Sequence, residues 1–182
     1  RVQILGCLTE GVSMRATTRL CDVSINTVTK LLVDVGTACD MYQNEVLRGL
    51  KCKRVQVDEI WSFVGMKEKN VPPMRKAQGE VGDIYTWTAI DADTKLVPSW
   101  LVGRRSLECT KMFTKDLASR MAHRIQLTSD GFHTYIDAVD EAFQGKVDYA
   151  MLVKTYSSVN AEGRAAETRY SPGDCTGAKR TP

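Results

Sequence analysis

Between residues 53 and 153 the hydrophobic pattern changes repeatedly between the two-residue period of strands and the longer period of helices. The order is strand, strand, strand, helix, strand, helix, strand. This order predicts an α/β fold, in which a mixed sheet has helices packed on it. The expected strands are residues 54–58, 83–91, 96–102, 125–130 and 147–153, and the expected helices are 107–121 and 133–143.

The first 50 residues have the pattern of short helices only. Helical spacing of apolar residues covers 4–8 and 13–20, and Ser24 is a good N-cap for a further helix from Ile25 to Val33. A short helix, a turn and an N-capped helix are typical of a helix-turn-helix, whose second helix enters the DNA major groove. We expect Asn26, Thr27, Thr29 and Lys30 to contact bases or phosphates, and Arg15 and Arg19 to contact the DNA backbone. The alternative is an ordinary helical hairpin whose polar face meets water.

Composition narrows the function classes. The 182 residues are 43% hydrophobic, which is typical of a globular chain, and the sequence contains no apolar run of the length that a membrane span needs. The six cysteines form no C-x-x-C pair, so we expect neither a structural zinc site nor an oxidising compartment. The net charge of +3 is divided into basic flanks and a mildly acidic centre, a distribution that suits a nuclease.

Two carboxylates follow the expected strands in a position that suits metal chemistry. Asp58 ends the first strand and Asp130 ends the fourth. If these strands are adjacent and parallel, both side chains emerge at the same edge of the sheet. Metal-dependent phosphoryl transfer needs such carboxylates to hold two divalent cations about 4 Å apart. The alternative is that both residues are ordinary turn formers at strand ends.

Several segments resemble bacterial insertion-sequence transposases of the DDE superfamily, in the first-described insertion-sequence family. The segments occur in the family's order and cover nearly the whole chain: Ser24-Ile25-Asn26-Thr27-Val28-Thr29-Lys30, Val57-Asp58-Glu59-Ile60-Trp61-Ser62-Phe63, Tyr85-Thr86-Trp87-Thr88-Ala89-Ile90-Asp91, Gln126-Leu127-Thr128-Ser129-Asp130-Gly131, Tyr149-Ala150-Met151-Leu152-Val153-Lys154 and Tyr170-Ser171-Pro172.

The resemblance implies a helix-turn-helix in residues 1–50 and a ribonuclease-H-like catalytic core in 53–182. It implies binding of terminal inverted repeats, then strand cleavage and transfer to target DNA with Mg²⁺ or Mn²⁺. Asp58 and Asp130 match the family's first two catalytic carboxylates and would be metal ligands. The family's mode of action further implies a homodimer or higher multimer on double-stranded DNA, in the bacterial cytoplasm at the nucleoid.

The sequence departs from the family at both ends. The chain stops at Pro182 before the Val-Glu-Arg-like stretch that carries the third catalytic glutamate, and it lacks the Cys-rich segment that often precedes the helix-turn-helix. Glu162 and Glu167 are the nearest substitutes, and their surroundings do not match the motif. We therefore expect a fragment with an incomplete catalytic site. The alternatives are a DNA-binding regulator without catalysis, a decayed remnant, or a cellular nuclease with the same core fold.

Four further residues are candidates for accessory roles. Glu59 should point to the opposite face from Asp58 and support the site indirectly, Trp61 could pack beside the site or touch DNA, and His133 could reach a phosphate or be an ordinary first-turn residue. Lys154 could approach the scissile phosphate or be solvated.

Arg104 and Arg105 could contact the DNA backbone or only water. Residues 154–182 should be a loop or linker.

Overall fold

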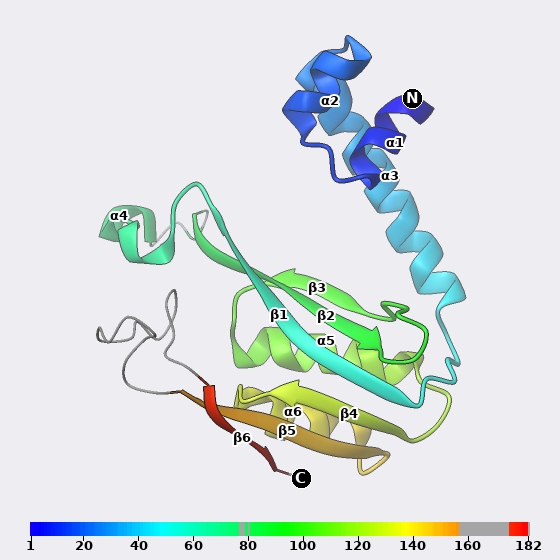
Figure 1. The fold of residues 1–182 in the computed structure, drawn as a ribbon, viewed down its shortest axis with the longest axis vertical. Coiled ribbons are helices and arrows are strands. Elements are labelled where there is room, and N and C mark those ends of the chain that lie inside the picture. Colours follow the sequence, from blue (N-terminus) through cyan, green and yellow to red (C-terminus); the bar gives the residue numbers. More distant parts are fainter. Residues whose placement is uncertain (77–78, 80, 157–174, 182) are drawn as a thin grey trace. The chain divides into compact units, whose positions relative to one another are not determined.

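The structure is a computed structural model that describes residues 1–76, 79, 81–156 and 175–181. It divides into two compact units, residues 1–48 and 49–182. The first unit is helical and the second contains the sheet (Figure 1).

Three helices make up the first unit: α1 (Val2–Thr9), α2 (Met14–Cys21) and α3 (Ile25–Val46). Ser13 and Ser24 are the N-caps of α2 and α3, and each side-chain oxygen accepts a hydrogen bond from a backbone N–H of the first turn. Ile4, Thr17 and Val28, one from each helix, are buried and form the centre of this unit.

Helix α3 is longer than its expected range of Ile25–Val33. It continues to Val46, because no proline interrupts it and one glycine inside a helix costs only about 1 kcal/mol. The ion pair between Lys30 and Asp34, four residues apart, adds support across the expected end.

The second unit is built on a six-stranded mixed sheet in the order β3-β2-β1-β4-β5-β6 (Figure 1). β1 is parallel to β4, and β4 to β5; the other neighbours are antiparallel. The strands are β1 (Arg54–Val64), β2 (Gly82–Asp91), β3 (Trp100–Gly103), β4 (Ile125–Asp130), β5 (Val147–Tyr156) and β6 (Cys175–Thr181). This mixed sheet, flanked by helices, is compatible with a ribonuclease-H-like fold.

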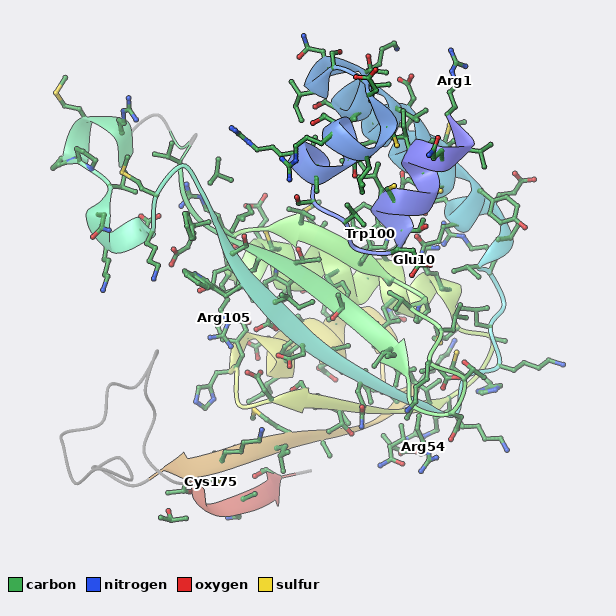
Figure 2. The ribbon with its side chains drawn as sticks, turned by 45° about the horizontal axis from the view of Figure 1, so that its top comes forward. Arg1, Glu10, Arg54, Trp100, Arg105 and Cys175 are labelled. Atoms are coloured by element: carbon green, nitrogen blue, oxygen red, sulfur yellow. The ribbon has the colours of Figure 1, made fainter. Side chains whose placement is uncertain are left out.

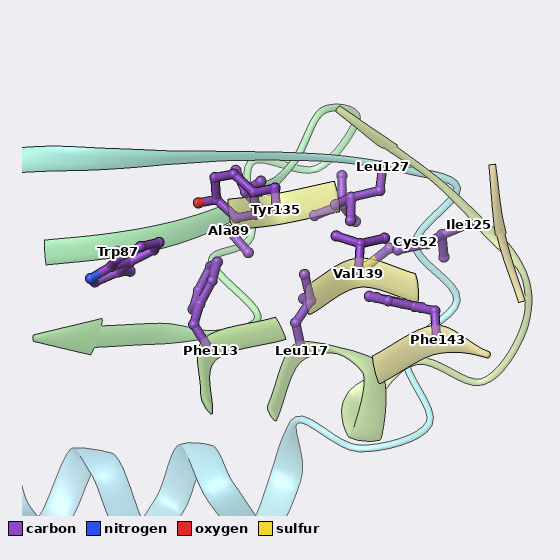
Figure 3. Close-up of a cluster of buried hydrophobic side chains, with 12 residues drawn as sticks. Cys52, Trp87, Ala89, Phe113, Leu117, Ile125, Leu127, Tyr135, Val139 and Phe143 are labelled. Atoms are coloured by element: carbon purple, nitrogen blue, oxygen red, sulfur yellow. The ribbon is translucent and has the colours of Figure 1, made fainter. Parts of the chain in front are cut away.

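Helices α5 (Leu107–Arg120) and α6 (Thr134–Phe143) pack on one face of the sheet and on each other. Figure 3 shows the core between them and the strands, with Trp87, Phe113, Leu117, Leu127 and Tyr135 fully buried. A short 3-10 helix η1 (Glu68–Asn70) and the helix α4 (Pro73–Lys76) lie between β1 and β2. In the part of the chain described here, no helix has the length and apolar character that crossing a membrane requires.

The expected strand 125–130 agrees with β4. In the turn after β2 the Asp91 side chain accepts hydrogen bonds from the backbone and hydroxyl of Thr94, which is ordinary turn chemistry for aspartate. The returning strand β3 begins only at Trp100 and not at Leu96, because Pro98 has no N–H to donate to a ladder.

Two expectations about strand ends were wrong. β1 does not end at Asp58 but continues to Val64, because residues 59–64 pair with the first half of β2. Residues 154–182 are not all loop: β5 continues to Tyr156, and Cys175–Thr181 adds β6 to its outer edge. Backbone pairing with an available strand edge decides this, although the side chains of 175–181 give little strand signal.

Candidate metal centre

The parallel register of β1 and β4 places Asp58 level with Asp130. Gln56 of β1 lies opposite Thr128 of β4, and two further residues along each strand lead to the two aspartates. Neighbouring strands are about 4.8 Å apart, so the two backbones hold these side chains next to each other. Asp58 therefore lies beside the end of β4, at Asp130, although β1 itself continues to Val64.

A third carboxylate, from Glu59, belongs to the same group. One ligand oxygen each from Asp58, Glu59 and Asp130 lies within 4.8 Å of the other two. Asp58 turns back over its own strand, where its Oδ1 accepts a hydrogen bond of 2.8 Å from the Glu59 backbone N–H. Asp130 Oδ1 accepts one of 3.0 Å from the backbone N–H of Phe132. Both aspartates are thus held by backbone groups.

Glu59 faces the helices, on the side of the sheet that strand alternation predicts. Its side chain is only 2% exposed, and its Oε1 accepts a hydrogen bond of 2.5 Å from the Tyr135 hydroxyl of α6. Its Oε2 pairs with the guanidinium of Arg105 at 2.9 Å. Glu59 therefore links the carboxylate group to the helical layer.

Burial raises the pKa of the Glu59 carboxyl above its ordinary value. The hydrogen bond from Tyr135 and the charge of Arg105 lower this pKa, and the nearby Asp130 raises it. Burial and then the Glu59 carboxylate raise the pKa of Tyr135, which keeps its hydroxyl protonated as a donor.

A groove of about 630 Å³ opens on the sheet face away from α5 and α6. Its walls include Asp58 and Asp130, and Lys154 of β5 lines the same groove. Lys154 is exposed, so one cationic side chain and two carboxylates face a common solvent-filled space.

The donor set fits a hard divalent cation. Mg²⁺ and Mn²⁺ favour carboxylate oxygens, and two oxygens on opposite sides of one Mg²⁺ lie about 4.2 Å apart. Three oxygens on one Mg²⁺ include neighbouring pairs about 3 Å apart, so the oxygens of Asp58, Glu59 and Asp130, which lie within 4.8 Å of one another, would have to move closer together to share one ion.

The other sequence candidates occupy varied positions. His133 is the exposed N-cap of α6, and its ring has no contact that ties it to the carboxylates. Trp61 packs on Phe63 with 5.8 Å between ring centroids, and Lys67 lies over its ring. Arg104 contacts Glu68. Glu162 and Glu167 lie outside the described residues.

The candidate DNA-contacting residues lie in the first unit. Arg15 and Arg19 are exposed on α2, and Asn26, Thr27, Thr29 and Lys30 are exposed on the first two turns of α3. The four α3 residues flank Val28, which is completely buried, so they form the outer side of the start of α3.

Sequence reasoning missed two residues of the site. Arg105 was weighed only for DNA or water, yet it pairs with Glu59 and Asp130. Tyr135 was not predicted to belong to the site, although it lies in the apolar stripe of α6, five residues after Asp130. The sequence did offer one signal for Tyr135: a tyrosine in a buried stripe needs a hydrogen-bond partner for its hydroxyl, and such a partner is a polar side chain nearby.

Neither a protein-family model nor a curated protein matches the chain. Among solved structures the chain is similar to one in a cryo-EM structure of the piggyBac transposase synaptic complex with hairpin DNA. The sequence identity is 17% and the TM-score 0.36, and the match covers 57% of this chain. It spans 23% of the other chain, so less than a quarter of that protein's length is compared.

Proposed function

We propose that this chain is part of a DNA transposase of the DDE type, with Asp58 and Asp130 as its first two catalytic carboxylates. The observation that carries the proposal is the closeness of three carboxylates, two of which, Asp58 and Asp130, line an open groove. The motifs of the sequence that resemble insertion-sequence transposases support the same function. The reaction would be cleavage of DNA phosphodiesters and transfer of a freed 3′-hydroxyl.

The roles of the chain's own residues follow from their positions. Asp58 and Asp130 would hold Mg²⁺ or Mn²⁺, with their orientation set by the backbone hydrogen bonds to Glu59 and Phe132. A cation bound there would polarise a phosphodiester oxygen and stabilise the charge that develops during cleavage. Lys154, on the wall of the groove, would attract the DNA backbone toward the carboxylates.

The first unit would bind the terminal inverted repeats. Its exposed Asn26 and Lys30 are side chains of the kinds that read adenine and guanine edges in the major groove. Arg15 and Arg19 on α2 would contact phosphates and fix the register. Assembly as a homodimer or higher multimer on paired DNA ends belongs to the same proposal.

Cation binding gives the first test. We expect isothermal titration of the full chain with Mn²⁺ to show binding that Asp58→Asn and Asp130→Asn each weaken at least tenfold. Asp148→Asn is a matched control, because Asp148 is an exposed, arginine-paired carboxylate at the start of β5. Equal binding by all three variants and the parent would contradict the assignment.

Cleavage gives the second test. Where the complete protein nicks DNA carrying the inverted repeats, each aspartate variant should lose cleavage while still binding that DNA. Cleavage retained by both variants would remove Asp58 and Asp130 from the mechanism.

A second candidate is a DNA-binding regulator without catalysis. The exposed polar start of α3 favours it, since binding would need only the first unit. This function predicts repeat binding that falls steeply with salt and is indifferent to EDTA. Loss of DNA binding when Mn²⁺ is removed would argue against it.

A further inference from the structure

Arg105 joins two of the three carboxylates through one guanidinium group. It lies between β3 and α5, at the opposite end of the sheet from Arg54 (Figure 2). Its Nε lies 2.9 Å from Glu59 Oε2, and its Nη2 lies 3.2 Å from Asp130 Oδ2. The contacts connect a residue of β1 with a residue of β4, so Arg105 spans the junction of the two parallel strands.

The guanidinium is held in place by more than its charge. Its central carbon lies 4.0 Å from the centroid of the Phe132 ring, a stacking distance for arginine on an aromatic face. Ser106, the next residue, caps α5 and fixes the backbone from which the side chain extends. The arginine therefore has a defined position over the carboxylates.

Three carboxylates this close repel one another, and Glu59 is almost completely removed from water. A cation beside them reduces that repulsion, and Arg105 supplies one positive charge. A divalent cation bound between the same carboxylates would need the oxygens that the guanidinium contacts, and it would be repelled by the guanidinium itself.

We propose that Arg105 is a built-in counter-cation that positions Glu59 and Asp130 in the metal-free protein and competes with the divalent cation for them. The inference rests on the proposed function, because it takes the carboxylates as a metal site. Arg105 is then a positioning residue whose displacement accompanies metal binding. Its side chain is 37% exposed, so it can move into solvent when a cation binds.

Removing Arg105 should strengthen metal binding, whereas removing a merely structural residue should weaken it. A single charge about 5 Å from a double charge in a water-like medium changes an affinity on the order of tenfold. We therefore expect the Arg105→Gln variant to bind Mn²⁺ about tenfold more tightly than the parent chain in isothermal titration. Arg105→Lys keeps the charge but cannot bridge two carboxylates, so its affinity should lie between the two.

Arg124→Gln is the matched control. Like Arg105, Arg124 contacts an aspartate, Asp148, through Nε and Nη2. It lies just before the first residue of β4, whereas Asp130 is the last residue of that strand. Its removal should leave Mn²⁺ affinity unchanged while it costs a surface ion pair. Circular dichroism of each variant is the check that the fold is retained. If Arg105→Gln does not fold, the Mn²⁺ affinity of Arg105→Lys is compared with that of the parent chain instead.

The outcomes separate the two proposals. Tighter Mn²⁺ binding on loss of Arg105, with no change in the control, supports the counter-cation role. Equal or weaker binding by both Arg105 variants, with the parent binding normally, overturns that role and leaves the metal site standing. Mn²⁺ binding by none of the folded variants, nor by the parent, overturns the proposed function and the counter-cation role with it.

Discussion

The hydroxyl of Tyr135 should stabilise the sheet unit through its bond to a buried charge. It donates a hydrogen bond of 2.5 Å to Glu59, and both side chains are almost completely inaccessible to water. Tyr135→Phe keeps the ring, which packs on Trp87 and Phe132, and removes the hydroxyl alone. A hydrogen bond to a charged group contributes about 1.5–3 kcal/mol, so we expect a loss of about 2 kcal/mol at pH 7.5.

The loss should depend on pH in a definite direction. The folded pKa of Glu59 lies above its ordinary value, so this residue favours the folded state fully at pH values below the unfolded pKa. That contribution is lost as the pH rises through the folded pKa. Because the Tyr135 hydrogen bond lowers the folded pKa, its removal raises that pKa further. The variant should therefore lose about 1 kcal/mol at pH 4, where the carboxyl is mainly protonated, and about 2 kcal/mol at pH 7.5.

Urea unfolding in EDTA, followed by tryptophan fluorescence, measures these differences. All three tryptophans belong to the unit 49–182, so the signal reports that unit and not the helices of residues 1–48. Differences between variant and parent at the same pH cancel the titration of other carboxyls. Linear extrapolation at each pH gives the two free energies of unfolding.

Tyr149→Phe is the control, because Tyr149 makes a similar bond without a charge. Its hydroxyl lies 2.7 Å from the hydroxyl of Ser129, which keeps a second bond to the backbone. Its loss should cost about 1 kcal/mol or less at both pH values. The reasoning is refuted if Tyr135→Phe costs no more than Tyr149→Phe, or if its cost is the same at pH 4 and pH 7.5.

Three further changes test the fold and the proposed DNA contacts of the first unit. Leu117→Ala should lower the free energy of unfolding by about 2–5 kcal/mol in the same urea assay, because this side chain is fully buried under the sheet. Its control is Met112→Ala, on the exposed side of α5, which should change the free energy of unfolding by less than about 0.5 kcal/mol. Ser106→Ala should cost about 1 kcal/mol, since its side chain caps α5, and a loss below about 0.3 kcal/mol would deny the cap any role. Lys30→Ala should weaken binding to repeat DNA and reduce the slope of log K against log salt by about 1 in a fluorescence-anisotropy titration, whereas Lys115→Ala on α5 should leave the slope unchanged.

The sequence was sufficient for the elements whose signal is local. The strand 125–130 alternates buried and partly buried residues throughout, and Ser24 marks the start of α3. It was insufficient where a neighbouring strand decides the outcome. The second half of β1 and the whole of β6 exist as strands because β2 and β5 offer backbone groups to pair with, and those partners are distant in the sequence.

The candidate site divides in the same way. Asp58 and Asp130 could be paired in advance, because parallel neighbouring strands bring residues at equal heights together. Glu59 could be assigned to the opposite face from Asp58, but not to the carboxylate group, because its carboxylate reaches the group only through a long side chain that Tyr135 and Arg105 hold in place.

Arg105 shows why side-chain networks exceed what a pattern can indicate. An arginine after a strand has the same local sequence whether it meets DNA, water or a carboxylate. Its partners are 46 residues before it and 25 residues after it, and they meet only once β1 and β4 are neighbours. In the proposed counter-cation role, the residue that offsets part of the carboxylates' negative charge is also the residue that a bound cation would displace. Stability of the empty site and affinity for the metal should therefore change in opposite directions when Arg105 is replaced.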